Sequence, residues 1–228
     1  MQANNSTPHL ATVYDAQVRI TIPYYDSFHK ETINLIKATR IDPKNWLDSG
    51  CGTGTLVQKA LPIFPDTQFT LADPSQEMLN VAMSKLAGMG DNRVNFLVPM
   101  GTQNLPKNMA KTDVITAIQS HHYVSPKERV RATEVCFELL TKGGVYVTFE
   151  NTRPFTNEGI EIGKENWKNF QLAQGRHSDT VQKHIERFDV EYHPITVEEH
   201  LSMLRRAGFS SVEMLWYSYM QAGFYGIK

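Results

Sequence analysis

The sequence predicts an α/β fold with one seven-stranded sheet, mostly parallel, with helices on both faces and an antiparallel hairpin at the C-terminus. Three observations support this fold. Short apolar segments alternate with longer segments whose apolar residues recur at helical spacing. A glycine-rich turn at residues 50–54 follows the first strand and precedes a helix. The last two strands, 211–217 and 222–227, are joined by a short connection, which implies antiparallel pairing.

The composition fits a single globular domain with an insertion. The chain has 228 residues, a net charge of −1 and 41% hydrophobic residues. The near-neutral charge gives no signal for a nucleic-acid partner, and no apolar run reaches the length of a membrane span. The two cysteines, Cys51 and Cys136, suit a reducing compartment. We therefore expect a cytoplasmic protein, monomeric or homodimeric, that acts on a small molecule.

Residues 1–40 are predicted to form a helical cap, and residues 41–228 the main domain. Helical spacing runs from Tyr14 to Lys37 with a break at Pro23, because proline cannot donate the backbone hydrogen bond of a helix interior. A helix placed before the sheet in this way is expected to cover a ligand cleft.

The glycine turn lies within the run Trp46–Leu56. Its three glycines permit a tight turn and remove side chains that would keep a ligand away from the backbone. A dinucleotide-binding turn requires G-x-G-x-x-G, but the third glycine of that pattern would fall at Thr55 or Val57. The pattern is instead D-x-G-x-G-x-G, beginning at Asp48, which argues against a dinucleotide. The alternative is a glycine-rich turn that binds nothing.

The second strand is predicted at Gln68–Ala72 and ends at Asp73. This aspartate lies about 20 residues beyond the glycine turn, where a carboxylate accepts hydrogen bonds from the two hydroxyls of a ribose. A single aspartate after a strand is otherwise a helix cap. Pro74 opens the next helix, which Gly88 and Gly90 are expected to end.

Three further strands are predicted at 94–98, 113–118 and 145–150. Between the last two, Ser125 and Glu128 form a capping box that starts a helix, expected to run to about Leu140 and to end at Gly143-Gly144. A second capping box, Thr196 with Glu199, starts a helix that ends at Gly208.

Residues 151–195 depart from the alternation of strands and helices. We expect a helical insertion over the edge of the sheet that forms part of a substrate pocket, because excursions of this length in compact domains are more often functional than idle.

In combination, these motifs resemble the class I S-adenosylmethionine (SAM) methyltransferases over about residues 41–228. The resemblance is carried by Asp48 with Gly50, Gly52 and Gly54, by Asp73 with Ser75, Met78 and Leu79, and by Gly143-Gly144 before the fifth strand. It implies a Rossmann-like methyltransferase sheet, SAM as cofactor, S-adenosylhomocysteine (SAH) as product, and methyl transfer to a small-molecule acceptor by in-line displacement. Family members usually have an aspartate that accepts from the adenine amino group, and here Thr102 stands at that position.

A finer resemblance points to the carboxy-SAM synthases. It is carried by Thr21–Tyr25, His200, Leu204, Ala207–Phe209, Trp216 and Gly223-Phe224. In that branch a tyrosine matching Tyr25 contacts SAM, and an arginine of the insertion holds the extra carboxylate. The matching segment here is Gln182–Arg187, in which the arginine is not in register. The tyrosine contact is therefore expected, while a carboxy-SAM synthase-like activity and a non-catalytic SAM- or SAH-binding regulatory protein are the alternatives.

The residues expected to contact SAM are Tyr25, Arg19, Asp48, Gly50, Cys51, Gly52, Asp73, Pro74, Thr102, Gln103 and Gln119. Asp48 is expected to orient the glycine loop or to receive the methionine amino group. Asp73 is expected to hold the ribose, Tyr25 to close over the cofactor, and Arg19 to bind the methionine carboxylate.

His121 and His122 are the candidates for a general base, because the fourth strand ends beside the methyl group in this fold and histidine takes up protons near neutral pH. The alternative is a packed histidine that caps the next helix. No metal site is expected, since adjacent histidines rarely bind one ion. Trp167, Trp216 and Tyr219 are expected either to wall an acceptor pocket or to belong to the core. The acceptor atom stays open among O, N, C and S, because the fold does not set it.

Overall fold

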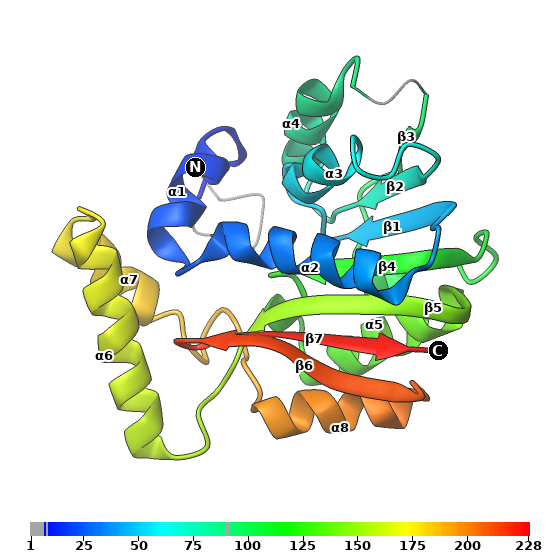
Figure 1. The fold of residues 1–228 in the computed structure, drawn as a ribbon. Coiled ribbons are helices and arrows are strands. Elements are labelled where there is room, and N and C mark those ends of the chain that lie inside the picture. The colour runs from blue at the N-terminus through cyan, green and yellow to red at the C-terminus, as the bar shows by residue number, and fades with distance from the viewer. Residues whose placement is uncertain (1–6, 8, 90–91) are drawn as a thin grey trace.

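The computed structural model describes residues 7, 9–89 and 92–228. Seven strands form one sheet in the order β3-β2-β1-β4-β5-β7-β6 (Figure 1). The strands are β1 Asn45–Ser49, β2 Gln68–Ala72, β3 Val94–Phe96, β4 Thr112–Ile118, β5 Leu140–Asn151, β6 Ser211–Ser218 and β7 Gln221–Ile227. Strand β1 pairs in parallel with β2 and β4, whereas β7 runs antiparallel to β5 and β6. The predicted fold class, including the antiparallel C-terminal hairpin, is confirmed.

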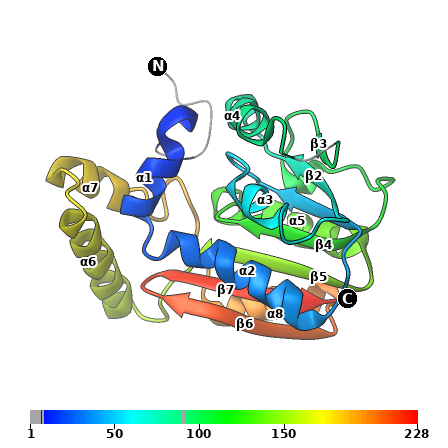
Figure 2. The same cartoon turned by 45° about the horizontal axis from the view of Figure 1, so that its top comes forward.

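Helices cover both faces of this sheet, as the sequence predicts (Figures 1 and 2). The helices are α1 Tyr14–Thr21, α2 Tyr25–Thr39, α3 Thr55–Ala60, α4 Gln76–Leu86, α5 Pro126–Leu139, α6 Asn157–Ala173, α7 Ser178–Ile185 and α8 Val197–Ala207. Helices α2 and α3 pack into one apolar layer, and α5 and α8 pack into the other.

The two apolar layers follow from the alternation of side chains along buried strands. In β4, Val114 and Ile118 face the layer of α2 and α3, while Ile115 and Ala117 face the layer of α5. All four are buried, which is why β4 reads as a continuous apolar run rather than an alternating one.

The cap breaks where the sequence predicts it. Ile22 is extended because Pro23 disfavours a helical residue before it, and Tyr24 then adopts a left-handed conformation with φ of 57°. The chain therefore turns between α1 and α2. Figures 1 and 2 both show α1 between α7 on one side and α4 on the other. The predicted stop at Gly90 lies outside the described residues.

The helix before β5 ends close to the predicted Leu140, but the prediction that Gly143-Gly144 ends it is wrong. Helix α5 ends at Leu139, and β5 begins at the next residue, so Gly143-Gly144 lies inside the strand. Leu140 already pairs with Thr112, and the register then shifts before Val114. A side chain at Gly144 would lie 2.9 Å from the Thr141 carbonyl oxygen. Gly144 thus serves an irregular strand, because the backbone approaches itself there too closely for a Cβ atom, whereas Gly143 has open space around it but a φ of 80°.

The insertion is helical, with α6 and α7 standing beyond the end of the sheet (Figure 1). The Trp167 indole of α6 is fully buried and donates a hydrogen bond of 2.7 Å to the Thr21 carbonyl of α1. The insertion is therefore attached to the cap rather than only to the sheet.

Candidate active site

A cleft of about 390 Å³ lies at the carboxyl ends of β1, β2 and β4, the edge at which doubly wound sheets bind ligands. It is lined by Tyr25, Asp48, Gly50, Cys51, Gly52, Asp73, Pro74, Thr102, Gln103, Gln119 and His121. Of the residues predicted from the sequence, Arg19 and His122 do not line it. Tyr14 and Ser120 also line it, and sequence reasoning did not single them out.

The glycine turn brings backbone directly to the cleft. Gly50 has φ of 74°, and a Cβ atom there would lie 2.1 Å from Ser120 Oγ. The N–H groups of Gly50 and Cys51 both donate to the Ala72 carbonyl, at 2.7 and 3.0 Å. This links the turn after β1 to the end of β2, and only glycine satisfies both its backbone angle and the space at position 50.

Asp73 is fixed at the end of β2 by two backbone N–H groups. Its Oδ2 accepts from Gly52 at 2.9 Å and its Oδ1 from Ser75 at 2.8 Å. Burial raises the pKa of Asp73, and the two N–H groups oppose this rise. Each carboxylate oxygen keeps a further lone pair for a ligand hydroxyl. The alternative that Asp73 is the helix cap is not realised, because Ser75 caps α4 by accepting from the Met78 N–H group.

Asp48 has one satisfied and one unsatisfied oxygen. Oδ1 accepts from Thr116 Oγ1 at 2.7 Å, and Thr116 in turn accepts from the Trp46 indole at 3.0 Å. Oδ2 is buried and has no hydrogen-bond partner among the described residues. Burial raises the pKa of Asp48 to about 7. A buried carboxylate in this condition is stabilised by an incoming cation.

Thr102 belongs to a buried hydrogen-bond chain. Its hydroxyl lies 2.7 Å from Ser49 Oγ and 2.9 Å from His121 Nε2, and His121 Nδ1 lies 3.2 Å from the Tyr146 hydroxyl. Burial lowers the pKa of His121 to about 4, so the ring is neutral at pH 7. Both ring nitrogens of His121 thus lie within hydrogen-bond distance of a hydroxyl, Nε2 of Thr102 and Nδ1 of Tyr146. Gln103 is the more accessible side chain for a purine edge.

His122 is directed away from the cleft into a pair with Glu150. Glu150 Oε2 accepts from His122 Nδ1 at 2.5 Å and from its backbone N–H at 3.0 Å. Burial alone would raise the pKa of Glu150, but the hydrogen bond from His122 lowers it to about 2. Burial lowers the pKa of His122, so the pair is an ionised carboxylate with a neutral ring. The other ring nitrogen of His122, Nε2, lies 3.2 Å from Asn151 Nδ2.

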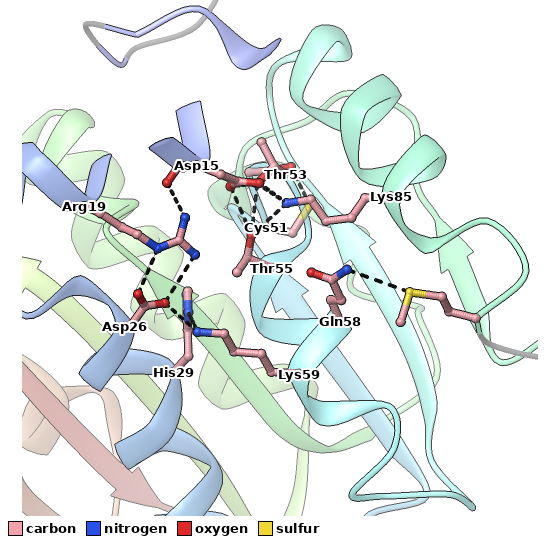
Figure 3. A network of polar contacts seen from close by, with 12 residues as sticks. Asp15, Arg19, Asp26, His29, Cys51, Thr53, Thr55, Gln58, Lys59 and Lys85 are labelled. Atoms are coloured by element: carbon pink, nitrogen blue, oxygen red, sulfur yellow. Dashed lines mark hydrogen bonds and ion pairs between the residues drawn. The ribbon is translucent and has the colours of Figure 1, made fainter. Parts of the chain in front are cut away.

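The cap is attached to the glycine turn through Asp15 of α1 (Figure 3). Asp15 Oδ1 accepts from Thr53 at 2.6 Å and from Thr55 at 3.1 Å, while Lys85 of α4 forms an ion pair with Oδ2. Lys85 also donates to both threonines, at 2.9 and 2.8 Å. We call this group the cap latch: Asp15, Thr53, Thr55 and Lys85. Nothing in the sequence marks it, because its members lie up to 70 residues apart.

Arg19 points to a second polar group on the cap (Figure 3). Its Nε donates to Asp26 at 2.8 Å, and Lys59 of α3 pairs with the same carboxylate at 2.6 Å. The guanidinium is thus occupied by Asp26 outside the cleft, which does not support the predicted contact with the methionine carboxylate.

The predicted aromatic wall does not form at the cleft. Trp167, Trp216 and Tyr219 are absent from the described lining residues, and Trp167 and Trp216 contribute to the core. Tyr25, by contrast, is buried at the cleft, with its ring 6.5 Å from that of Tyr14. Among the described residues no group of three or more His, Cys, Asp and Glu is placed to hold a metal, and none of the described helices is long and apolar enough to cross a membrane.

The residues of the cleft fit SAM. The unsatisfied Asp48 oxygen suits the amino group of the methionine part, and Asp73 suits the ribose diol. The close approach at Gly50 leaves the turn free of side chains where the cofactor would cross it. The Nε2 of Gln119 is also buried without a partner among the described residues, so the cleft offers an unused donor besides an unused acceptor.

Known proteins support this assignment. The family model described as methyltransferase domain matches residues 47–146. The carboxy-S-adenosyl-L-methionine synthase of Campylobacter lari is 27% identical over 214 residues, which cover 91% of this chain and 87% of that protein. The protein of the same name from Helicobacter hepaticus is 24% identical with the same coverage.

Solved structures support the same fold. A putative O-methyltransferase from Nostoc punctiforme superposes with a TM-score of 0.68 at 14% identity, covering 96% of this chain and 60% of that one. Human N-acetylserotonin methyltransferase in complex with SAM gives 0.64 at 13% identity, covering 96% and 55%. The chain thus spans somewhat over half the length of these two structures.

The sheet order, the cleft and the comparisons agree on one assignment. The sheet has the seven-stranded mixed form that the resemblance implies, and the glycine turn and Asp73 lie within the matched residues. Residues 47–146 match a methyltransferase domain, the fold is that of the Rossmann-like methyltransferases, and the chain is similar over nine-tenths of its length to carboxy-SAM synthases.

Proposed function

We propose that the protein transfers the methyl group of SAM to a small-molecule acceptor. The observation that supports this most directly is the pairing of an unsatisfied Asp48 oxygen with a backbone-anchored Asp73 on either side of the glycine turn. Bound SAM supplies an electrophilic methyl group on a sulfonium, whose bond to sulfur breaks as the bond to the acceptor forms. The protein then needs to hold the reactants in line and to exclude water.

Each lining residue has a proposed task. Asp48 receives the methionine amino group, and the backbone of Gly50, Cys51 and Gly52 lies along the methionine and ribose. Asp73 and Pro74 border the ribose. The remaining cofactor contacts are assigned to Tyr25, Thr102 and Gln103, which line the cleft around these groups, while Gln119 lines both the cleft and the smaller cavity beside it. Arg19 has no task in this proposal, because its guanidinium pairs with Asp26.

A general base, where the acceptor needs one, is proposed at His121 alone, acting through the Thr102 hydroxyl that contacts its Nε2 and lines the cleft. His121 lines the cleft, whereas His122 is held by Glu150 outside it. His121→Gln tests this role through the pH dependence of kcat. Loss of an acidic limb with unchanged SAM affinity supports a base, and an unchanged pH profile with weaker SAM binding assigns His121 to positioning Thr102.

The activity is tested by incubating the protein with SAM labelled at the methyl carbon and a metabolite extract. We expect label in a small molecule and formation of SAH, with binding of SAM lost in Asp73→Ala. Binding of SAM without label transfer to any acceptor would favour the regulatory alternative, and absence of SAM binding would contradict the proposal.

A second candidate, synthesis of a carboxylated SAM, is favoured by one observation: the C. lari and H. hepaticus relatives carry that name and cover nine-tenths of this chain. Mass spectrometry of the ligand that co-purifies with the protein separates the two candidates. The added mass of a carboxylate on SAM favours the second, and unmodified SAM or SAH favours methyl transfer.

We further propose that the protein works in the cytoplasm as a monomer or homodimer without nucleic acid. The free thiols of Cys51 and Cys136 and the near-neutral net charge support this. Size-exclusion chromatography with light scattering tests the oligomeric state. An electrophoretic mobility shift assay with tRNA tests whether the protein binds nucleic acid.

A further inference from the structure

A second, smaller cavity adjoins the cofactor cleft. Its volume is about 20 Å³, and it shares Tyr14, Gln119 and Tyr123 with the cleft. Tyr192 and His184 of the insertion form its far side. A cavity of this volume holds one water-sized group. It therefore suits a single functional group that enters from the cofactor side, not a ring.

Gln119 is one of two unsatisfied donors at this cavity. It directly follows β4, has φ of 55°, and is fixed by a hydrogen bond of 2.6 Å from its N–H to the Phe149 carbonyl. Its side chain is 9% exposed, and Nε2 has no partner among the described residues. A non-glycine residue in this conformation is strained, and such strain is concentrated at functional sites.

Tyr192 is the other unsatisfied donor. It is 1% exposed, and its hydroxyl has no partner among the described residues. Burial raises the pKa of Tyr192, so the hydroxyl keeps its proton and donates. A buried donor without a partner costs about 1–3 kcal/mol. Two such donors from distant segments, at a cavity the size of one group, indicate a position built for an oxygen atom.

The charges around the cavity favour an oxygen over an ammonium. No aspartate or glutamate lines it among the described residues. Burial and the charges of Arg176 and Arg187 lower the pKa of His9 to about 4. The same causes lower the pKa of His184 well below its usual value, so both histidines are neutral at pH 7. His184 Nδ1 lies 3.1 Å from the amide nitrogen of Gln171, whose oxygen accepts from Arg176. The proton of His184 is thereby placed on Nε2, which makes it another donor.

We propose that this cavity, hereafter the oxygen pocket (Tyr14, Gln119, Tyr123, His184 and Tyr192), receives an oxygen atom of the methyl acceptor. Gln119 Nε2 and Tyr192 Oη donate to this oxygen. The acceptor is then a small molecule with a carbonyl, enolate or carboxylate oxygen, and an ammonium group is disfavoured in this pocket because no anionic side chain lines it among the described residues. The inference rests on the proposed function, since the oxygen pocket opens to the cofactor cleft.

The test uses the full chain, labelled with ¹⁵N and saturated with SAH, at pH 7. Acetate, acetamide and ethylammonium are titrated as probes of similar size, and the side-chain amide signal of Gln119 is followed by NMR. That signal is assigned by its loss in Gln119→Met. We expect acetate and acetamide to shift it, ethylammonium to leave it unchanged, and Tyr192→Phe to weaken acetate binding about tenfold, as for one hydrogen bond to a charged group.

Tyr217→Phe is the matched control, because Tyr217 is a half-exposed tyrosine on β6 outside both cavities. The SAH dissociation constant, measured on the same samples, distinguishes a failure of the proposed function from a failure of the oxygen pocket. Loss of SAH binding in the unmodified protein would contradict the proposed function. Intact SAH binding with a Gln119 signal that ignores acetate, responds equally to ethylammonium, or is indifferent to Tyr192→Phe would overturn the oxygen pocket and leave the cavity to a structural water.

Discussion

Two parts of the molecule, which we name the cofactor half (residues 45–86) and, after its proposed role, the acceptor half (residues 140–227), are assembled by different contacts. In the cofactor half, backbone N–H groups of the glycine turn fix a central carboxylate, as when Gly52 N–H donates to Asp73, 21 residues away. In the acceptor half the decisive bonds join distant residues, such as Trp167 to Thr21, 146 residues apart. A site made from backbone needs glycines at fixed spacing, whereas a site made from distant side chains leaves no local pattern.

The largest expected effect tests the cofactor half. Asp73→Ala removes two acceptors for the ribose and the partner of the Gly52 N–H group. We expect SAM affinity to fall at least about a hundredfold, since charge-assisted hydrogen bonds contribute roughly 1.5–3 kcal/mol each. Isothermal titration measures the affinity, and circular dichroism confirms the fold. Glu77→Ala, on the exposed first turn of α4, is the control. A loss below tenfold would contradict the ribose role.

The next effect concerns pH. The pKa of Asp48 is about 7 without ligand, and an ammonium partner binds the ionised form. SAM affinity should therefore rise about fivefold from pH 6 to pH 7 and at most about twofold more above pH 7, because the ionised fraction of Asp48 is roughly one tenth at pH 6 and one half at pH 7. Titrations at pH 5.5 to 8 measure this.

Asp48→Asn is the control for that dependence. It should bind SAM about tenfold more weakly at pH 8 and show no slope near pH 7. The raised pKa of Asp48 means that the ligand-free fold loses stability as pH rises towards 7. Asp48→Asn has no carboxyl group to ionise, so its Tm at pH 8 should be higher than that of the unmodified protein. A slope that persists in Asp48→Asn would assign the titration to another group.

The cap latch, which borders the cofactor half, should give a smaller, kinetic effect. Asp15→Asn removes the charge that pairs with Lys85. We expect SAH to dissociate roughly threefold to tenfold faster, with less dependence on salt, because a partly exposed ion pair contributes only modestly. Stopped-flow displacement measures the rate. Glu161→Gln, which breaks an exposed ion pair with Lys164 on α6, should leave it unchanged. Equal acceleration in both variants would refute a specific latch.

The smallest effect is expected in the acceptor half. Trp167→Phe keeps most of the buried ring but removes the hydrogen bond to Thr21. The free energy of unfolding should fall by about 1–3 kcal/mol, because the Thr21 carbonyl loses its donor and a cavity remains. SAM affinity should change less than twofold. Denaturant titration gives the first value. A loss of SAM affinity as large as that of Asp48→Asn would erase the distinction between the halves.

This contrast explains what the sequence could predict. The sheet, its hairpin and the lining residues from Asp48 to Asp73 follow from strand periodicity and from motifs at the ends of the first two strands, whereas Thr102 follows from the family resemblance. Gly143-Gly144 was misplaced because its close approach to Thr141 depends on the pairing of β4 with β5. Tyr192 was not singled out because a tyrosine in an irregular segment has no sequence signal for a buried, unsatisfied hydroxyl.

The eight-residue helix α1 touches both halves, with Asp15 near its start held by the glycine turn and Thr21 at its end held by Trp167. Because a helix this short moves as a rigid unit, a ligand that immobilises one end of α1 also immobilises the other end. We therefore expect the two ligands to bind cooperatively. Thermodynamic linkage then requires reciprocity: the factor by which SAM tightens the acceptor must equal the factor by which the acceptor tightens SAM.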